Sequence, residues 1–314
     1  MTNNKLTTEI IKKMYYCAFN NVPTKLGIKK LSGGLKNLVY LLDDGQKYYV
    51  LKTEPINKKI APIDKNTIWW EAQILKELKD IINNIPKLIY YSDGFDEYNH
   101  PFLIMSYIEG NNYNNCKENI SKEQKNKISY ELGKIAYKIS SIRKDKYFIP
   151  SFPQEVFNNN YELIEFMFKS ILKVYKNHHI NIEGITASEI LSLVKSKEKE
   201  LKNVNQISLC NTDLWDGNIL VKNGKISGIL DFNDTFYCDE LMTFYFHLID
   251  CEMDEYFLLG YNNKKLTYDE TIRIEVYRLY SLLKMITDCE IKKYGRFGNM
   301  YTKFFEQYKK LSRI

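Results

Sequence analysis

The sequence predicts an α+β protein with two lobes, a β-rich N-terminal lobe followed by a larger, mainly helical lobe. Three observations lead to this prediction. The chain has 314 residues, too many for one small core. Its first hundred residues contain short strand-like runs around one helical stretch. Beyond them, apolar residues recur mostly at helical spacing. We place the boundary near residues 107–112, with an N-terminal lobe at 1–107 and a C-terminal lobe at 108–314.

The N-terminal part carries the signals of an antiparallel sheet with one helix. Strand-like runs at 37–42 and 47–53 flank Asp43-Asp44-Gly45, where glycine permits the positive φ of a hairpin turn. Two more strands are expected at 87–91 and 102–107. Asn66 or Thr67 can cap a helix between the two pairs of strands. Its apolar residues at helical spacing are Ile68, Ala72, Leu75 and Leu78.

The C-terminal part is expected to be helical, with a few short strands. Ser121 and Gln124 form a capping-box pair ahead of an amphipathic helix whose apolar residues step by 4, 3, 4 and 3. Further helices are expected at about 160–175, at 187–202 and from the last strand to the C-terminus. The strands are expected at 207–211, 218–221 and 226–232, the last two joined by an Asn223-Gly224 turn.

Composition and charge exclude several classes of protein. Hydrophobic residues make up 44 % of the chain, so it folds around a core. The net charge is +6, but the lysines are scattered and no run of five or more basic residues suggests a nucleic-acid surface. Six cysteines without a C-x-x-C pair indicate free thiols in a reducing cytosol. The polar N-terminus is no signal peptide, and no apolar run reaches the roughly 20 residues of a membrane span. We expect a soluble, cytoplasmic monomer whose partner is a small molecule.

The segments most informative about chemistry are 209–221 (LCNTDLWDGNILV) and 228–234 (GILDFND). Asp213 and Asn218 are five residues apart across a turn, and Asp231 follows a hairpin that can return it beside them. Phosphoryl transfer requires such a set, because hard oxygen ligands hold Mg²⁺ against the phosphates and a separate carboxylate orients the attacking hydroxyl. Each residue alone is ordinary turn chemistry. Together they predict a phosphoryl-transfer site.

These segments resemble the aminoglycoside phosphotransferase family, which includes choline and fructosamine kinase relatives and has a protein-kinase-like bilobal fold. The family loop His-x-Asp-x-x-x-x-Asn appears here as Asn211-x-Asp213-x-x-x-x-Asn218, and the following strand ends in Asp231. The resemblance implies that Asp213 is the catalytic base and that Asn218 and Asp231 are the Mg²⁺ ligands. Asn211 replaces the family's histidine, and we expect altered scaffolding of the loop because asparagine both donates and accepts hydrogen bonds.

A buried ion pair is expected in the N-terminal lobe. Glu71 lies on the apolar side of its helix, with Ile68 and Leu75 three residues before and four after it. A buried carboxylate needs a partner, and Lys52 in the strand YYVLKTE is the candidate. In kinase-like folds such a pair positions the α- and β-phosphates of the nucleotide. The 19-residue separation resembles the arrangement in kinases.

Other parts of the nucleotide site are also expected in the first lobe. Gly33 and Gly34 lie ahead of the Lys52 strand, where glycines let backbone N–H groups approach phosphate oxygens. Residues 102–110 (FLIMSYIEG) resemble the hinge between the family's lobes, so backbone groups from Ser106 to Ile108 are expected to bind the edge of the nucleobase. The sequence does not distinguish ATP from GTP.

An excess of acidic residues points to a cationic substrate. Residues 226–263 contain eight acids and no lysine or arginine, and such a patch attracts ammonium groups. Asp239 is a candidate for a structural role. The expected substrate-binding residues are Asp234, Asp250, Glu252, Asp254 and Glu255. An aminoglycoside is the leading substrate class, and choline-like alcohols and amino sugars are alternatives.

The predicted reaction follows from these assignments. The triphosphate binds between the lobes, Asn218 and Asp231 bind Mg²⁺, and Asp213 accepts the hydroxyl proton during in-line transfer. Asn211 keeps a second hypothesis open, a nucleotide-binding regulator with weak catalysis. A protein kinase is disfavoured, because the chain has Asp-Phe-Asn where those enzymes have Asp-Phe-Gly and carries no Ala-Pro-Glu element.

Overall fold

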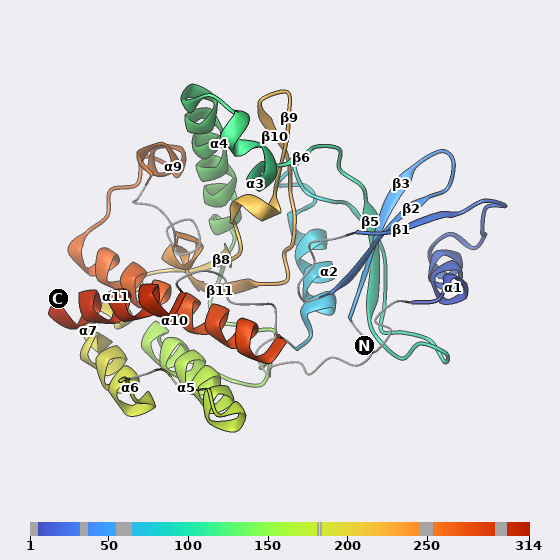
Figure 1. Ribbon diagram of the computed structural model, residues 1–314. Helices are drawn as coiled ribbons and strands as arrows, with labels where there is room; N and C mark the ends of the chain where they lie inside the picture. The colour runs from blue at the N-terminus through green and yellow to red at the C-terminus, as the bar shows by residue number, and fades with distance from the viewer. Residues whose placement is uncertain are drawn as a thin grey trace. The chain divides into compact units, whose positions relative to one another are not determined.

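The computed structural model describes residues 6–31, 37–54, 65–180, 182, 184–244, 254–292 and 300–314. The chain forms two compact units. The first comprises Met1–Lys58, Asn66–Asn119 and Asp216–Asn233, and the second comprises Lys59–Lys65, Ile120–Trp215 and Asp234–Ile314. The predicted α+β class is confirmed, because the first unit contains a five-stranded antiparallel sheet and the second is mostly helical (Figure 1). The division into a nucleotide-binding lobe at 1–107 and a catalytic lobe at 108–314 stays a proposal.

The sheet of the first unit has the strand order β1-β2-β3-β5-β4, and all neighbouring strands are antiparallel. The strands are β1 (Gly27–Lys30), β2 (Leu38–Asp43), β3 (Tyr48–Thr53), β4 (Leu88–Ser92) and β5 (Phe102–Ser106). The predicted hairpin between β2 and β3 is present. Its Gly45 has φ +86°, and Asp43 and Tyr48 pair at its base.

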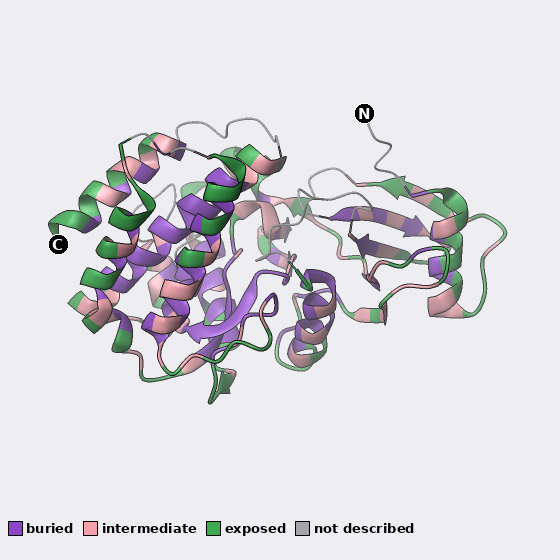
Figure 2. Ribbon diagram, turned by 90° about the horizontal axis from the view of Figure 1, so that it is seen from below, coloured by how far each residue is buried: buried purple, intermediate pink, exposed green. Residues whose placement is uncertain are grey.

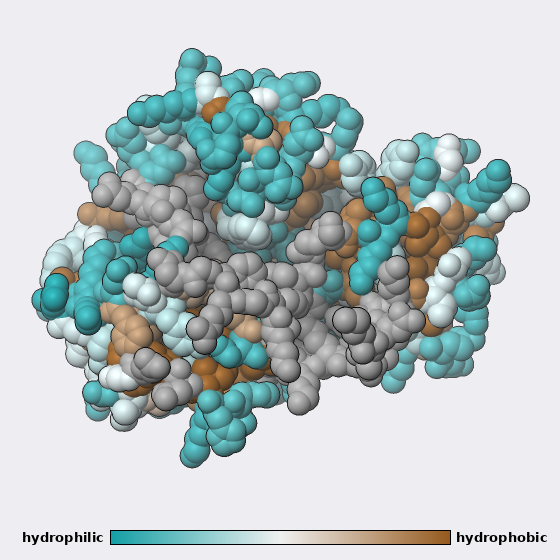
Figure 3. Space-filling model, in the orientation of Figure 1, coloured by the Kyte–Doolittle hydropathy of each residue, from teal (hydrophilic) through white to brown (hydrophobic). Residues whose placement is uncertain are grey.

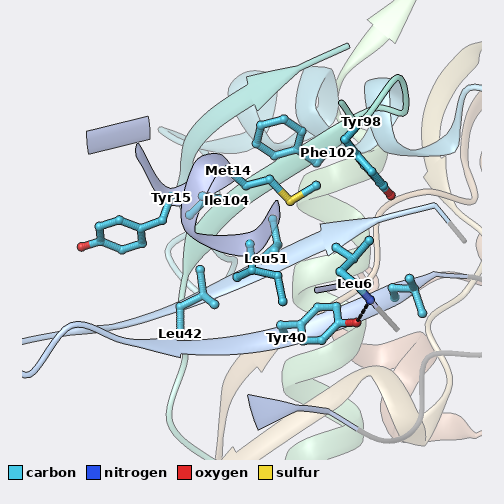
Figure 4. Packing of buried hydrophobic residues seen from close by; sticks show 11 residues of the cluster. Leu6, Met14, Tyr15, Tyr40, Leu42, Leu51, Tyr98, Phe102 and Ile104 are labelled. Atoms are coloured by element: carbon cyan, nitrogen blue, oxygen red, sulfur yellow. Dashed lines mark hydrogen bonds between the residues drawn. The ribbon is translucent and has the colours of Figure 1, made fainter. Parts of the chain in front are cut away.

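One face of this sheet packs against α1 (Thr8–Phe19). In β2, Leu38, Tyr40 and Leu42 are buried and alternate with half-buried residues, the period of a strand with one face in a core. These side chains join Met14 and Tyr15 of α1 in the cluster shown in Figure 4. The sequence analysis expected a single helix in this part of the chain, so α1 is an additional element.

The opposite face of the sheet packs against α2 (Thr67–Leu78), the helix that the sequence predicted. In β5, Phe102 and Ile104 belong to the cluster on the α1 side. Leu103 alternates with them and is also fully buried, so it points to the α2 side. This sheet therefore has two apolar faces, each covered by one helix.

A second, three-stranded sheet in the first unit contains the hairpin that ends just before Asp231. Its strands are β6 (Asn111–Asn112), β9 (Ile219–Lys222) and β10 (Lys225–Ile229), in the order β10-β9-β6. The predicted turn is present, with Asn223 at φ +54° and Gly224 at φ +73°, as a two-residue hairpin requires. Short helical turns adjoin the sheet, namely α3 (Tyr113–Cys116), η2 (Lys117–Asn119) and η3 (Asp216–Asn218).

The second unit consists mainly of helices. They are α4 (Lys122–Ser140), α5 (Asn160–His178), α6 (Ala187–Ser196), α7 (Glu198–Lys202), α9 (Glu255–Gly260), α10 (Tyr268–Lys292) and α11 (Met300–Arg313). The capping box of Ser121 and Gln124 at the start of α4 is present. Figure 2 shows buried stripes along these helices and exposed residues on their outer sides. Mostly hydrophilic residues cover the face over α4 in Figure 3.

A small sheet in the second unit was only partly predicted. It has the order β11-β8-β7, with β7 (Arg143–Lys144), β8 (Ile207–Asn211), β11 (Thr235–Asp239) and a following 3-10 turn η4 (Glu240–Thr243). The expectation of helix from residue 233 onward is wrong for β11, which is buried along its whole length. Its hydrogen bonds go to β8, more than 20 residues earlier in the chain, so no local signal revealed it. Within the described residues, no helix has the length and apolar character needed to cross a bilayer.

Candidate active site

Lys52 is the centre of a charged cluster in the first unit. Its Nζ lies 2.7 Å from Glu71 Oε2 and 2.8 Å from Asp231 Oδ1. Lys52 is 4 % exposed and Glu71 is 1 % exposed, whereas the side chain of Asp231 is 32 % exposed. The predicted pairing of Lys52 with Glu71 is therefore confirmed. The cluster also brings Asp231 to the same amine, although 179 residues separate the two in sequence.

The alternation of β3 and the periodicity of α2 aim these two side chains at each other. Leu51 packs in the cluster on the α1 side of the sheet, so the next residue, Lys52, points to the α2 side. In α2, Ile68 and Leu75 are buried on the same side of the helix as Glu71. Hydrophobic packing between the sheet and α2 thus positions both charged side chains, and their ion pair is buried within this packing.

Glu71 also holds the loop that carries Asp231. Its Oε1 accepts a hydrogen bond from the backbone N–H of Phe232 at 3.3 Å. On the other side of Asp231, the N–H of Leu230 donates to the carbonyl of Asn218 at 2.8 Å. Asp231 itself has φ +63°, a left-handed conformation that is uncommon outside glycine. Contacts on both sides keep it there, as is common for residues at functional sites.

Burial and charge act in opposite directions on the two paired groups. Burial is the largest effect on Lys52 and lowers its pKa, but the charges of Asp231 and Glu71 outweigh it, so the net pKa is raised. For Glu71, burial raises the pKa above its ordinary value of 4.5, and the positive charge of Lys52 only partly opposes this. The lysine is therefore cationic at neutral pH.

Two side chains missed by the sequence analysis hold the turn that carries Asn218. Asn112 Nδ2 donates to the carbonyl of Gly217 at 2.5 Å. Lys117 Nζ lies 2.8 Å from Asp216 Oδ2. These contacts join residues about 100 positions apart, so the local sequence did not predict them. They fix the peptide units directly before Asn218.

Asn218 and Asp231 offer an amide oxygen and a carboxylate, both hard donors of the kind that Mg²⁺ prefers. They lie in the same unit, at the two ends of the β9–β10 hairpin, and the Leu230–Asn218 backbone hydrogen bond ties those ends together. Among the described residues, no group of three or more His, Cys, Asp or Glu side chains could hold a metal ion. This donor set suits an ion that keeps water and phosphate oxygens as its other ligands.

Two backbone N–H groups of the expected hinge already donate hydrogen bonds to backbone carbonyls of the first unit. The N–H of Ser106 donates to Lys87 O at 2.9 Å, and the N–H of Tyr107 donates to Tyr48 O at 3.3 Å. Ile108 packs on the β10 strand, where a Cβ on Gly228 would lie 2.9 Å from its Cγ2. Glycine at 228 is thus required for this close approach. Of the backbone donors expected to bind a nucleobase, two are already used in the sheet.

Four of the predicted residues lie outside the described parts of the chain. They are Gly33 and Gly34 of the phosphate-binding loop and Asp250 and Glu252 of the substrate set.

Asp213 lies in the second unit, just after β8, and is half-buried. Its backbone N–H donates to Asn211 Oδ1 at 2.9 Å. Asn211 is fully buried, so its side chain scaffolds the loop from inside. Its Nδ2 is buried and has no hydrogen-bond partner among the described residues. The expected alteration of the scaffolding by asparagine stays a prediction.

Basic side chains from other parts of the chain neutralise part of the negative charge of the acidic segment 226–263. Four of its acids face bases from other parts of the chain, and only tertiary structure could reveal this. The pairs and their N···O distances are Asp231 with Lys52 (2.8 Å), Asp234 with Lys284 (2.9 Å), Asp239 with Arg273 (2.8 Å) and Glu240 with Lys264 (2.9 Å). The sequence count of eight acids against no bases therefore overstates the local negative potential.

The individual substrate candidates differ in their surroundings. Asp234 is 4 % exposed and held by Lys284. Asp254 caps α9 by accepting from the N–H of Tyr256 at 2.8 Å, and it also accepts from the hydroxyl of Ser129. Glu255, in the first turn of the same helix, is exposed.

The model of the phosphotransferase enzyme family matches residues 27–262. No curated protein sequence matches the chain.

Solved structures with the same fold cover nearly the whole chain. One is a gentamicin complex of APH(2")-IIa, 19 % identical, with a TM-score of 0.62 over 99 % of this chain and 97 % of that chain. Another is a putative fructosamine-3-kinase from Thermobifida fusca YX-ER1, 12 % identical, with a TM-score of 0.71 over 98 % of this chain and 100 % of that chain. A third is a putative fructosamine-3-kinase from Haemophilus somnus 129PT, 15 % identical, with a TM-score of 0.70 over 96 % and 97 %.

Proposed function

This chain belongs to the phosphotransferase enzyme family, and on that basis we propose that it transfers the γ-phosphoryl group of ATP or GTP to a hydroxyl of an aminoglycoside. The membership itself makes it a small-molecule kinase. The observation that carries the proposal for its chemistry is the Lys52–Glu71–Asp231 cluster. It places a buried cation beside a half-exposed carboxylate, the combination that phosphates and their metal ion need.

The first unit holds the nucleotide in this proposal. Lys52, oriented by Glu71, contacts the α- and β-phosphates, and Gly33 and Gly34 supply backbone donors to them. The N–H groups of Ser106 and Tyr107 already form hydrogen bonds within the sheet. The N–H of Ile108 is therefore the proposed donor to the nucleobase edge, and Ser106 contributes only its backbone carbonyl, as an acceptor.

Asn218 and Asp231 are the proposed ligands of Mg²⁺, which neutralises charge on the phosphates when bound. Asp231 is paired with Lys52 at 2.8 Å, so the two residues would place a metal ligand and a phosphate-binding cation side by side. Asp213 accepts a hydrogen bond from the substrate hydroxyl and takes its proton late in the transfer. No covalent enzyme intermediate is required.

Two observations support an amino-bearing substrate. The segment 226–263 has eight acids, and Glu255 is exposed within it. We therefore propose Asp250, Glu252 and Glu255 as contacts to ammonium groups. For Asp234 and Asp254, a substrate would have to compete with partners within the second unit.

A fructosamine or amino-sugar kinase is the second candidate function. The TM-scores of 0.70 and 0.71 with two putative fructosamine-3-kinases favour it. The neutralisation of four acids also favours a substrate with fewer positive charges than an aminoglycoside. If the aminoglycoside proposal holds and extends to antibiotic resistance, expression of the gene should instead raise the tolerated aminoglycoside concentration.

The decisive experiment is a phosphorylation screen. Purified protein is incubated with Mg²⁺ and either ATP or GTP, and with gentamicin, kanamycin, a fructosamine, glucosamine or choline. Product mass identifies the acceptor. Turnover of gentamicin or kanamycin supports the aminoglycoside proposal, and turnover of the fructosamine alone replaces it with the second candidate.

Asp213→Asn is the matched control for chemistry. It should lower kcat by roughly 10²–10⁴ while nucleotide affinity stays close to that of the wild type. A variant that turns over as fast as the wild type would remove Asp213 from the role of base. Nucleotide binding without turnover of any acceptor in the wild type would favour a regulator.

A further inference from the structure

One face of α10 carries a row of buried polar side chains. Arg273, Tyr277, Ser281 and Lys284 are separated by 4, 4 and 3 residues, so they lie on the same side of the helix. All are between 0 and 6 % exposed. We call these four residues the α10 polar row. A buried row of this kind is costly unless its groups find partners.

Three members of the row find partners at the two ends of β11, and Ser281 Oγ has no hydrogen-bond partner among the described residues. Arg273 Nε and the Tyr277 hydroxyl donate to Asp239 Oδ2 at 2.8 and 2.7 Å. Lys284 Nζ donates to Asp234 Oδ1 at 2.9 Å. Asp239 is the last residue of β11, and Asp234 directly precedes its first. Each end of the strand is thus fixed by a charge from the same helix.

Helix and strand dimensions explain why both contacts form together. From Arg273 to Lys284 the helix rises about 16 Å, at about 1.5 Å per residue. From Asp239 back to Asp234 an extended strand covers about 17 Å, at about 3.3 Å per residue. The two lengths match, so α10 runs antiparallel to β11 and holds it at both ends.

The Asp234 end of β11 continues into the loop that carries Asp213. The carbonyl of Asp234 accepts two hydrogen bonds from Thr212, one from its N–H at 3.0 Å and one from its hydroxyl at 2.6 Å. Thr212 is fully buried, and the N–H of Asp213 donates to Asn211. Thr212, the residue directly before Asp213, is therefore held in place by hydrogen bonds to the Asp234 carbonyl.

We propose that Lys284 is a positioning residue for Asp213, acting through the Asp234 carboxylate, the Asp234 peptide and Thr212. Without Lys284, the buried carboxylate of Asp234 loses the ion pair that fixes its orientation, and the side chain turns. Turning moves its own peptide, and Thr212 moves with it. This inference rests on the proposed role of Asp213 as the base, where a displacement of about 1 Å costs on the order of 100-fold in rate.

Arg273 provides a matched control within the same row. It makes the same type of buried ion pair with Asp239, but at the far end of β11, five residues from Asp234. Removing either base leaves a buried aspartate without its cation. Only the loss of Lys284 does so next to the Asp213 loop. Arg273 also donates to the carbonyls of Glu200 and Asn203. A purely structural role for the row therefore predicts that Arg273→Met lowers kcat at least as much as Lys284→Met.

The test compares Lys284→Met with Arg273→Met, using the acceptor found in the phosphorylation screen. Both kcat and KM are measured per folded molecule, with the folded fraction taken from circular dichroism at the assay temperature. Lys284→Met should lower kcat about 10- to 100-fold and change the KM for nucleotide less than about threefold. Arg273→Met should keep kcat within about threefold of the wild type. Adding Asp234→Asn to Lys284→Met removes the buried charge that lost its lysine and should recover part of the lost kcat.

The outcomes separate this inference from the proposed function. If Asp213→Asn is inactive while Lys284→Met keeps the wild-type kcat, the positioning role is overturned and the proposed function stands. Equal kcat losses in Lys284→Met and Arg273→Met also overturn it. If Asp213→Asn is fully active, the proposed function itself has failed.

A variant closer to the loop covers the case in which Lys284→Met does not fold. Thr212→Val keeps the shape of the side chain and removes only the 2.6 Å hydrogen bond to Asp234. It should lower kcat about 3- to 30-fold at unchanged nucleotide KM. A wild-type kcat in this variant overturns the proposal.

Discussion

Replacing Lys52 by methionine tests whether the charged cluster of the first unit is as tightly coupled as its geometry indicates. Methionine keeps most of the length of the lysine side chain, so the main change is the loss of the ammonium group. That group lies 2.7 Å from Glu71 and 2.8 Å from Asp231. The variant leaves two carboxylates without their shared cation.

The free-energy cost of losing the cation differs between the two carboxylates, because their solvent exposure differs. Glu71 is 1 % exposed, and an unpaired charge in that position costs about 3–5 kcal/mol. The side chain of Asp231 is 32 % exposed, so water replaces most of what it loses and its share is about 0–1 kcal/mol. The expected destabilisation of the first unit is therefore about 3–5 kcal/mol. The Glu71 contribution dominates.

The same argument predicts how the variant responds to pH. In Lys52→Met, the pKa of Glu71 rises further above its ordinary value of 4.5, because burial is no longer opposed by a cation. Between 4.5 and the raised pKa, the folded state holds this proton and the unfolded state has released it. Stability then falls as pH rises, by about 1.4 kcal/mol per pH unit.

Tryptophan fluorescence in urea is a suitable assay. Trp69 and Trp70 directly precede Glu71 in α2, and Trp70 is buried. The third tryptophan, Trp215, is 42 % exposed and contributes less change on unfolding. The control is Lys52→Met with Glu71→Gln, which removes the ionisable group and should recover most of the lost stability at pH 8. The reasoning is refuted if the single variant unfolds at the wild-type urea concentration, or if its stability is independent of pH.

Further predictions concern the metal site and the helix packing. Asn112→Leu removes the 2.5 Å hydrogen bond to the peptide before Asn218, and it should raise the Mg²⁺ concentration for half-maximal turnover roughly 10-fold; an unchanged Mg²⁺ titration would contradict this. Chelation with EDTA should stop turnover in the wild type, and excess Mg²⁺ should restore it; activity that persists in EDTA would remove the metal from the proposal. Gly133→Ala should destabilise the second unit by about 1–3 kcal/mol or more, because its Cβ would lie 2.2 Å from the carbonyl of Phe257. Thermal unfolding measures this, with the exposed Lys134→Ala as control, and equal midpoints in the two variants would be the contrary result.

Local patterns were sufficient for most of the elements near the site. The turns at Gly45 and at Asn223-Gly224, the capping box at Ser121 and helix α2 all follow from residues within a few positions of each other. The pairing of Lys52 with Glu71 was predictable for a related reason. The apolar stripe of a helix dictates which way a charged residue points, and a buried carboxylate must find a cation.

Elements defined by distant partners were not predictable in this way. β11 was expected to be helical, because its strand pairing depends on β8. Helix α1 was missed for no such reason, since Thr7 caps it and its buried residues Ile11, Met14 and Tyr15 recur at helical spacing. The supports for Asn218 come from residues about 100 positions earlier. Their side chains, Asn112 and Lys117, are ordinary polar residues in the sequence.

The charge of residues 226–263 shows most clearly which properties the sequence determines and which depend on the tertiary structure. The sequence by itself determined the proposed donor set, since the spacing of Asp213, Asn218 and Asp231 along the chain does not depend on what surrounds them. Only the tertiary structure decided how much of the acidic charge remains, because Lys52, Arg273, Lys264 and Lys284 reach it from elsewhere in the chain. Electrostatic energy depends on distance in space, and a count along the chain does not contain it.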